Sequence, residues 1–264
     1  MSSSADRRPA RARRRIPRGW VPDQHGAWAM LATPPLVGAI VGGASWWHLL
    51  LAAAWLSAYC TFYAAGQWLR SGRKRRYLPP LLGHGAVLLV LGGALLIARP
   101  GLLHWAPAYA VLLAVSLVCS ARRADRSWLN DIVTVLAACL MTPVAAGLGH
   151  DDWAGSRSAW IAAGLLAAYF LGTVPYVKTM IRERGNVTVY RVSLGYHVVL
   201  LLAALEAAWV PRTAWQTWLL VPVAVGLLLR AGLMPRRGRV RPAVVGAGEV
   251  VATVLVGAAT LAIV

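Results

Sequence analysis

The sequence predicts an all-α polytopic membrane protein with nine transmembrane helices. Of its 264 residues, 58% are hydrophobic and only 14% are charged. The apolar residues fall into nine stretches of about twenty residues, each long enough to cross roughly 30 Å of hydrocarbon. The connections between these stretches are too short for a folded domain outside the membrane. Together these observations exclude a soluble globular protein.

The nine apolar stretches follow one another along the chain from residue 27 to its end. Gly38 and Gly42 are four residues apart and predict a notch where another helix approaches closely, and Pro143 predicts a kink in the fifth stretch. The spans are predicted at Ala27–Gly43, Trp46–Trp68, Pro79–Ala98, Leu102–Ser120, Trp128–Leu148, Ser158–Met180, Val192–Val210, Ala214–Leu233 and Ala243–Val264.

The basic residues assign the connections to the two sides of the membrane. Of the 27 Lys and Arg residues, all but Arg99, Arg157 and Arg212 lie in the N-terminal segment or in every second connection. Because cytoplasmic connections retain positive charge during insertion, this pattern predicts that the N-terminus is inside and the C-terminus outside. The net charge of +18 is thus read as a topology signal, and nucleic acid is not an expected partner. The strong preference for Arg over Lys is typical of a GC-rich bacterium and predicts a bacterial cytoplasmic (inner) membrane.

Residues 1–20 are basic and poor in apolar side chains, and they are predicted to form a disordered cytoplasmic tail before a nine-helix domain at 21–264. Cys60, Cys119 and Cys139 lie inside spans without CxxC spacing, so neither a disulfide nor a zinc site is expected. Phosphate-binding, dinucleotide-binding and hydrolase motifs of soluble enzymes are absent from the sequence.

Polar residues at the predicted cytoplasmic ends of the spans carry the functional information, because ionisable groups in lipid are costly unless partnered. His25 precedes the first span, as a ligand or proton group or as part of a helix cap. Asn130 and Asp131 open the fifth span, where a carboxylate at a helix N-terminus is stabilised by the backbone N–H groups. Both a capping role and a site role remain open for this pair.

The segment from Tyr176 to Arg191 is the richest in polar residues. Lys178 and Arg182 are four residues apart and therefore point to one side of a helix, which favours direct binding of a phosphate or carboxylate. Tyr190 and His197 share a face of the seventh span, and Glu249 is deep enough to require a cation or a proton. We expect one cytoplasm-facing cavity, lined by His25, Asn130, Asp131, Lys178, Arg182, Glu183, Asn186, Tyr190, His197 and Glu249.

Three stretches of the chain resemble the bacterial YwiC-like membrane proteins. They are DQHGAWAMLATPPLVG at 23–38, the Asn130–Asp131 pair before an apolar span, and LGTVPYVKTMIRERGN at 171–186. The resemblance covers nearly everything after Arg18. It implies a class of membrane protein and no particular activity.

The plan of nine helices with polar cytoplasmic loops after the second and sixth spans is also similar to that of the UbiA-type intramembrane prenyltransferases, so a UbiA-like bundle is expected. Enzymes of that type hold Mg²⁺ with Asp-rich motifs in those loops. Here the first loop, at 66–76, contains no acidic residue and the second contains only Glu183. Mg²⁺ is therefore not expected, no metal site is predicted, and any other cofactor is left open.

Two classes of function remain open, and whether the protein is an enzyme is undecided. The first is a bundle that binds an anionic amphipathic lipid, related to isoprenoids or quinones, among other membrane lipids. The second is a small-molecule transporter or a factor that assembles membrane complexes, in which His197, Glu206 and Glu249 would be proton-linked or packing groups.

Overall fold

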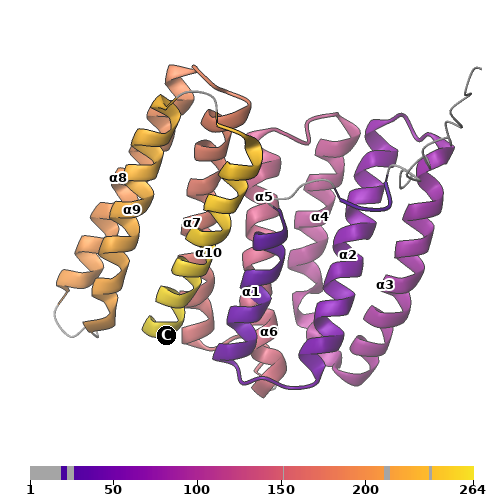
Figure 1. Ribbon diagram of the computed structural model, residues 1–264. Coiled ribbons are helices and arrows are strands. Elements are labelled where there is room, and N and C mark those ends of the chain that lie inside the picture. Colours follow the sequence, from indigo (N-terminus) through magenta and orange to yellow (C-terminus); the bar gives the residue numbers. More distant parts are fainter. Residues whose placement is uncertain (1–18, 23–26, 151, 211–214, 238–239) are drawn as a thin grey trace, which may run out of the picture.

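The structure is a computed structural model that describes residues 19–22, 27–150, 152–210, 215–237 and 240–264. In these residues the regular structure is entirely helical, and Figure 1 shows the helices side by side in one bundle. His25 and most of the predicted tail lie outside the described residues. Trp20, at the end of that tail, packs edge-on against the His84 ring.

The chain forms ten α-helices and four short 3-10 helices in the described residues. The α-helices are α1 (Ala27–Val41), α2 (Trp47–Arg70), α3 (Leu78–Ala98), α4 (Ala106–Ala121), α5 (Trp128–Cys139), α6 (Met141–His150), α7 (Arg157–Ile181), α8 (Val187–Trp209), α9 (Leu220–Leu233) and α10 (Pro242–Ile263). The 3-10 helices are η1 (Arg75–Tyr77), η2 (Pro100–Trp105), η3 (Trp215–Leu219) and η4 (Met234–Arg236).

Within the described residues, eight helical segments are long and apolar enough to cross a membrane, and α1 is a shorter apolar helix. They correspond in order to the nine predicted spans. The prediction of an all-α polytopic membrane protein is confirmed. The 3-10 helix η2 continues into α4 and completes the fourth predicted span, and η3 continues into α9 and completes the eighth predicted span.

Two boundaries differ from the prediction. The fifth span is two helices, α5 and α6, interrupted at Leu140. Pro143 explains the break, because it has no N–H to donate to the carbonyl of Cys139 and its ring crowds that carbonyl. The helix α8 begins at Val187, five residues before the predicted start at Val192, because the side chain of Asn186 accepts hydrogen bonds from Thr188 N and Val189 N and caps it.

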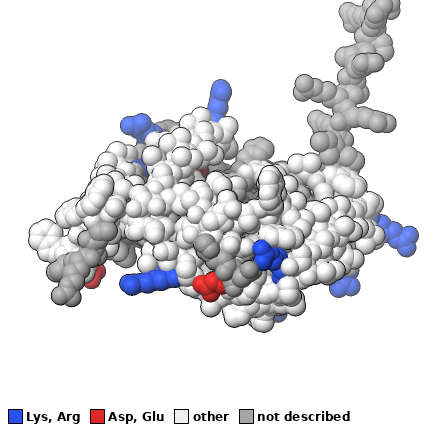
Figure 2. Space-filling model, turned by 90° about the horizontal axis from the view of Figure 1, so that it is seen from below, with Lys and Arg blue, Asp and Glu red and all other residues white. Residues whose placement is uncertain are grey.

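The connections α2–α3, α4–α5, α7–α8 and α9–α10 meet at one end of the bundle, the upper end in Figure 1. We call this the basic end, since these connections carry most of the Lys and Arg residues in the part of the chain that the structure describes. Seen from the other end, the surface is almost uncharged, with a few scattered basic and acidic side chains (Figure 2). Assignment of the basic end to the cytoplasm stays a prediction.

The bundle has two halves, which we call the N-terminal half (α1–α6) and the C-terminal half (α7–α10). The helix α1 joins them, because it packs against α5 and α6 on one side and α7 and α10 on the other. Its contact with α6 is very close: a Cβ added to Gly38 would overlap the carbonyl oxygen of Thr142, and one added to Gly42 would overlap that of Ala146. The predicted packing notch is confirmed.

Candidate functional site

The ammonium group of Lys178 is the centre of a polar cluster at the basic end. It lies 2.7 Å from Asp131 Oδ2 on α5, donates a hydrogen bond of 2.9 Å to the carbonyl oxygen of Arg126, and lies 4.6 Å from the centre of the Trp128 ring. Lys178 thus joins the last turn of α7 to the first turn of α5.

The first turn of α5 directs two neighbouring polar side chains to different helices. Ser127 caps the helix, because its hydroxyl accepts a hydrogen bond from Asn130 N. Successive residues of an α-helix point about 100° apart, so Asp131 meets α7 whereas Asn130 meets α4. Asn130 is buried, and its side-chain oxygen accepts a 2.5 Å hydrogen bond from the Ser116 hydroxyl.

A second polar cluster, around Asp125, surrounds Asn130 between α2, α4 and α5. The side chain of Asn130 donates to the Asp125 carbonyl oxygen at 2.8 Å, and Ser120 donates to the Asp125 carboxylate at 2.6 Å. Arg70 lies 3.9 Å from the same carboxylate. We did not single out Asp125, Ser116 and Ser120 from the sequence, although two serines four residues apart in an apolar span were a signal for a polar helix face.

The guanidinium of Arg182 lies at the end of α7, where it is exposed. Partial burial and the positive charge of Arg126 lower the pKa of Arg182 below its usual value, and Asp131 partly offsets this effect. Both Lys178 and Arg182 therefore interact with Asp131, in agreement with the prediction that they point to one side of a helix. Lys178 is not a free cation, however, because a carboxylate of the chain already pairs with it.

Three further candidate residues, Glu183, Asn186 and Tyr190, stabilise the connection between α7 and α8. Gly185 has a positive φ of 83°, a backbone conformation that glycine adopts readily, and lies in the turn. Asn186 caps α8 and donates to the Glu183 carboxylate at 3.1 Å. The Tyr190 hydroxyl donates to the Gly232 carbonyl oxygen on α9 at 3.0 Å. These contacts give each of the three side chains a structural role in the connection between α7 and α8.

His197 is almost fully buried between α8 and α7, at 1% exposure. Its Nδ1 lies 2.7 Å from the Ser193 carbonyl oxygen, one turn earlier. A Cβ at Gly172 would lie 2.8 Å from the Tyr196 ring and 3.4 Å from His197 Nε2, so this glycine lets the two rings approach α7. Glu206, in contrast, is exposed on α8 and does not face the bundle.

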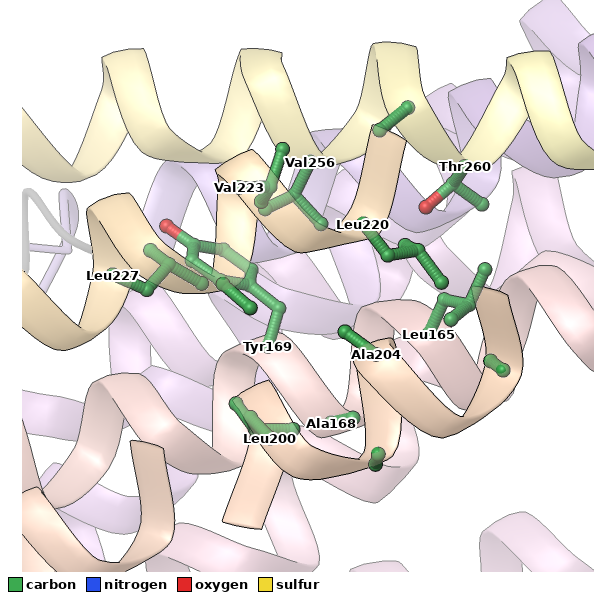
Figure 3. A pocket seen from close by; sticks show the side chains of 14 residues that line it. Leu165, Ala168, Tyr169, Leu200, Ala204, Leu220, Val223, Leu227, Val256 and Thr260 are labelled. Atoms are coloured by element: carbon green, nitrogen blue, oxygen red, sulfur yellow. The ribbon is translucent and has the colours of Figure 1, made fainter. Parts of the chain in front are cut away.

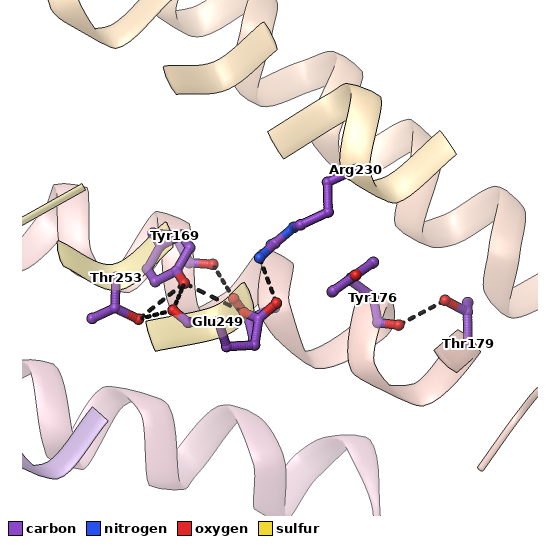
Figure 4. Close-up of polar contacts among 7 residues, drawn as sticks. Tyr169, Tyr176, Thr179, Arg230, Glu249 and Thr253 are labelled. Carbon is purple, nitrogen blue, oxygen red and sulfur yellow. Dashed lines mark hydrogen bonds and ion pairs between the residues drawn. The ribbon is translucent and has the colours of Figure 1, made fainter. Parts of the chain in front are cut away.

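Glu249 faces the bundle as predicted, and of the two predicted alternatives, a cation or a proton, the structure supplies a cation, since the carboxylate forms an ion pair with Arg230. The pair joins α10 to α9 two helical turns from the start of α10 (Figure 4). Arg230 also stacks on α7, with its guanidinium carbon 4.2 Å from the centre of the Tyr176 ring. The Tyr169 hydroxyl donates to Glu249 Oε2 at 3.3 Å and lies 3.0 Å from the Thr253 hydroxyl.

We did not predict these partners of Glu249. In the sequence, Arg230 resembles the basic residues that mark the cytoplasmic end of a span. Tyr169 and Thr253 resemble ordinary residues inside a span. The available signal was the pair Glu249 and Thr253, four residues apart on an apolar helix.

The prediction of one shared cavity for the candidate residues is wrong. Asn130, Asp131, Lys178 and Arg182 are brought together at the ends of α5 and α7, whereas Glu249 lies in the C-terminal half beside Arg230. The physical reason is that each polar side chain finds a partner on its nearest neighbouring helix. In the described part of the chain, no group of three or more His, Cys, Asp or Glu residues is placed to hold a metal ion.

Among the described residues, a larger and a smaller cavity have mainly apolar walls, and no candidate residue lines either of these two. The larger, of about 670 Å³, lies among α1–α6 and extends from Trp105 and Met141 to Ser116 and Thr134. The smaller, of about 190 Å³, lies among α7–α10 (Figure 3). We call them the N-terminal cavity and the C-terminal cavity. Thr134 is one turn from Asn130, so the N-terminal cavity ends next to the polar clusters of the basic end.

Comparison with known proteins establishes the family. The family model for YwiC-like proteins matches residues 21–146. A relative described as the uncharacterised protein YwiC of Bacillus subtilis is 31% identical over 194 residues, which are 72% of this chain and 79% of the relative. The chain belongs to the YwiC-like family. A second relative of this chain is described as an uncharacterised protein of Haemophilus influenzae and is 24% identical over 221 residues, 82% of this chain and 87% of the relative.

No solved structure matches this YwiC-like chain. The predicted likeness to UbiA-type prenyltransferases therefore stays a prediction. The region matched by the family model, residues 21–146, contains Asn130, Asp131 and nearly all residues that line the N-terminal cavity.

Proposed function

We propose that this YwiC-like membrane protein binds an anionic amphipathic lipid, with its apolar chain in the N-terminal cavity and its charged head at the basic end. The observation that supports this most is the size and lining of the cavity, about 670 Å³ with walls from α1–α6. Pockets for small molecules and cofactors typically have volumes of about 300 to 1,000 Å³ and mainly apolar walls. Isoprenoid or quinone-related lipids belong to the class of ligand that suits such a space.

Most of the polar side chains in the cavity wall already have partners in the protein, although the buried Trp105 indole N–H finds no acceptor among the described residues. The Tyr109 hydroxyl donates to the Ala137 carbonyl oxygen at 3.1 Å, and the Trp55 indole donates to that of Leu31 at 3.0 Å. A polar ligand group in the middle of the cavity would therefore lose its hydration and gain few hydrogen bonds. This favours a hydrocarbon chain as the occupant.

The end of the cavity near Ser116 and Thr134 determines where the head of the lipid would lie. One helical turn further are Asn130 and Asp131, followed by Lys178 and Arg182. An anionic head would meet the exposed Arg182 first and would compete with Asp131 for Lys178. Direct contact by basic side chains is thus the proposed mode of recognition, without a bridging Mg²⁺.

The experiment is native mass spectrometry of the protein purified from membranes, with identification of the extracted lipid. Ala110 is an accessible residue of the cavity wall on α4, so Ala110→Phe fills part of the cavity without overpacking the core. Ala108 is exposed two residues earlier and does not line the cavity, which makes Ala108→Phe the matched control. We expect an anionic lipid on the native protein and the control, and loss of most of it from Ala110→Phe.

Two results would contradict the proposal. One is equal retention of the lipid by Ala110→Phe and Ala108→Phe, which would place the lipid outside the cavity. The other is a bound lipid without a negative charge, which would leave the hydrocarbon chain in place but remove the role of Arg182 and Lys178.

A further inference from the structure

We propose that the C-terminal half contains a separate binding site for a small carboxylate or phosphate that carries an apolar group of about ring size. The anion would bind one edge of the Arg230 guanidinium, and the apolar group would occupy the C-terminal cavity. This site is independent of the N-terminal cavity, because its residues lie on α7–α10.

The guanidinium of Arg230 uses only part of its hydrogen-bonding capacity. Its Nη1 pairs with Glu249, whereas Nε and Nη2 are buried and find no acceptor among the described residues. These two groups donate on the same side of the planar guanidinium and form the fork that matches both oxygens of a carboxylate or phosphate. Buried donors without an acceptor are rare and costly, particularly in a membrane. The unpaired fork indicates an anion acceptor, which would have to displace the side chains that now cover both nitrogens.

Neighbouring residues hold the fork in one orientation. The guanidinium carbon of Arg230 lies 4.2 Å from the centre of the Tyr176 ring (Figure 4). Glu249 is fixed in turn by Tyr169, and Tyr169 contacts the Thr253 hydroxyl at 3.0 Å. A group that is ordered before the ligand arrives loses little conformational entropy on binding.

The chemistry of the pair selects an anion over a cation. Both oxygens of Glu249 are occupied, Oε1 by Arg230 and Oε2 by the Tyr169 hydroxyl. The groups still available are therefore N–H donors of Arg230, which a ligand can satisfy only with acceptor atoms.

The C-terminal cavity determines the size of the rest of the ligand. It has a volume of about 190 Å³, and an apolar cavity of about 150 Å³ is sufficient for benzene. Leu227 in its wall is one helical turn before Arg230, and Tyr169 in its wall contacts Glu249. At its far end the buried Thr260 hydroxyl has no partner among the described residues and points toward the lining side chains in Figure 3.

The test uses 4-fluorobenzoate as the probe, with ¹⁹F NMR titration of the full-length protein in lipid nanodiscs. We expect saturable binding that Arg230→Gln/Glu249→Gln weakens at least tenfold, since this double variant removes the fork without leaving a single buried charge. Glu249→Gln alone retains the fork and removes the competing carboxylate, so it is expected to bind as tightly as the native protein or more tightly. Thermal unfolding of each variant checks that it is folded.

A second pair of variants tests the cavity itself. Ala203 is accessible and lines the C-terminal cavity, whereas Leu202 is 59% exposed and does not line it. Ala203→Phe is expected to weaken binding of 4-fluorobenzoate, and Leu202→Phe to leave it unchanged. Competition by oleate would assign the anion to a lipid, and competition by benzoate but not oleate would assign it to a small free acid.

Absence of saturable binding, or equal affinity in the native protein and Arg230→Gln/Glu249→Gln, would overturn the proposal. So would equal effects of Ala203→Phe and Leu202→Phe. The outcome is separable from the proposed lipid binding, because Ala110→Phe changes only the N-terminal cavity and should not affect 4-fluorobenzoate.

Discussion

The two halves of the bundle place polar groups and open space in opposite ways. In the N-terminal half, Asn130 and Asp131 lie at the basic end, where Asp131 pairs with Lys178 of the C-terminal half, and the interior contains a cavity of about 670 Å³ with mainly apolar walls. In the C-terminal half, the ion pair of Arg230 and Glu249 lies inside the bundle, and the cavity has only about 190 Å³.

This difference separates two ways of tolerating charge in a membrane protein. At the basic end, Lys178 and Asp131 have side chains that are 11% and 23% exposed, so water and headgroups share in their solvation. The side chains of Arg230 and Glu249 are similarly exposed, at 14% and 10%, but this pair lies two helical turns inside α10, where Tyr169 and Tyr176 are its neighbours. Disruption of the deeper pair should therefore have the larger effect on stability.

The largest effect is expected for Glu249→Ala. The substitution leaves the buried Arg230 without its carboxylate, and removal of one partner of a buried ion pair typically costs about 3 to 5 kcal/mol. The measurement is the free energy of unfolding in detergent micelles or bicelles. A loss below about 1 kcal/mol would mean that the pair is solvated like a surface pair, and the contrast between the two halves would disappear.

The control for this prediction replaces both charges. Buried ion pairs can often be replaced by apolar residues of similar volume without loss of stability. Arg230→Met/Glu249→Leu should therefore be clearly more stable than Glu249→Ala. If the double variant is as unstable as the single one, packing around the pair rather than charge burial determines the loss.

A smaller effect is expected at the contact that closes the N-terminal half. Gly38→Ala would place its Cβ against the Thr142 backbone and 2.9 Å from the Ala145 Cβ, so α1 and α6 would have to separate. Overpacking of this kind costs about 1 to 3 kcal/mol. In Gly93→Ala on α3, the new Cβ meets no atom within 4 Å, so the helix should gain up to about 1 kcal/mol from the better propensity of Ala. If unfolding measurements show that the two substitutions change the free energy of unfolding in the same direction, the close contact between α1 and α6 is contradicted.

The sequence predicted features that depend on one helix at a time. Length and hydropathy give the spans, Pro143 gives the break between α5 and α6, and Gly38 with Gly42 gives a notch. The need of Glu249 for a cation also follows from its depth alone.

Features that depend on several helices were not predicted. Arg230 and Glu249 are 19 residues apart on different helices, so the spacing along one helix does not reveal their contact. The N-terminal cavity is formed by six helices from Ala, Leu and aromatic residues of the same types that face lipid elsewhere, so no sequence pattern distinguishes its walls. The single predicted cavity failed for the same reason: depth in a span predicts that a polar residue needs a partner but not which helix supplies it.

The smallest effect is expected for Asp131→Asn, and it tests whether the ion pair at the basic end holds Lys178 ready for a lipid head. The substitution keeps the size of the side chain and removes the negative charge that pairs with the Lys178 ammonium. A partly exposed pair is worth about 1 kcal/mol or less. The stability of the protein should therefore change little, and the freed lysine should bind an anionic lipid up to about fivefold more tightly, the equivalent of about 1 kcal/mol.

The matched control for Asp131→Asn is Glu183→Gln, which removes the same charge from the exposed turn between α7 and α8, where Glu183 contacts Asn186 rather than Lys178. Both variants are titrated with anionic lipid by native mass spectrometry beside the native protein. A gain in affinity for Asp131→Asn alone identifies Asp131 as a local competitor for Lys178. An equal gain in affinity for both variants would mean that the change in net charge alone explains the effect. A loss of affinity for Asp131→Asn would mean that Asp131 positions the lysine rather than competing with the ligand.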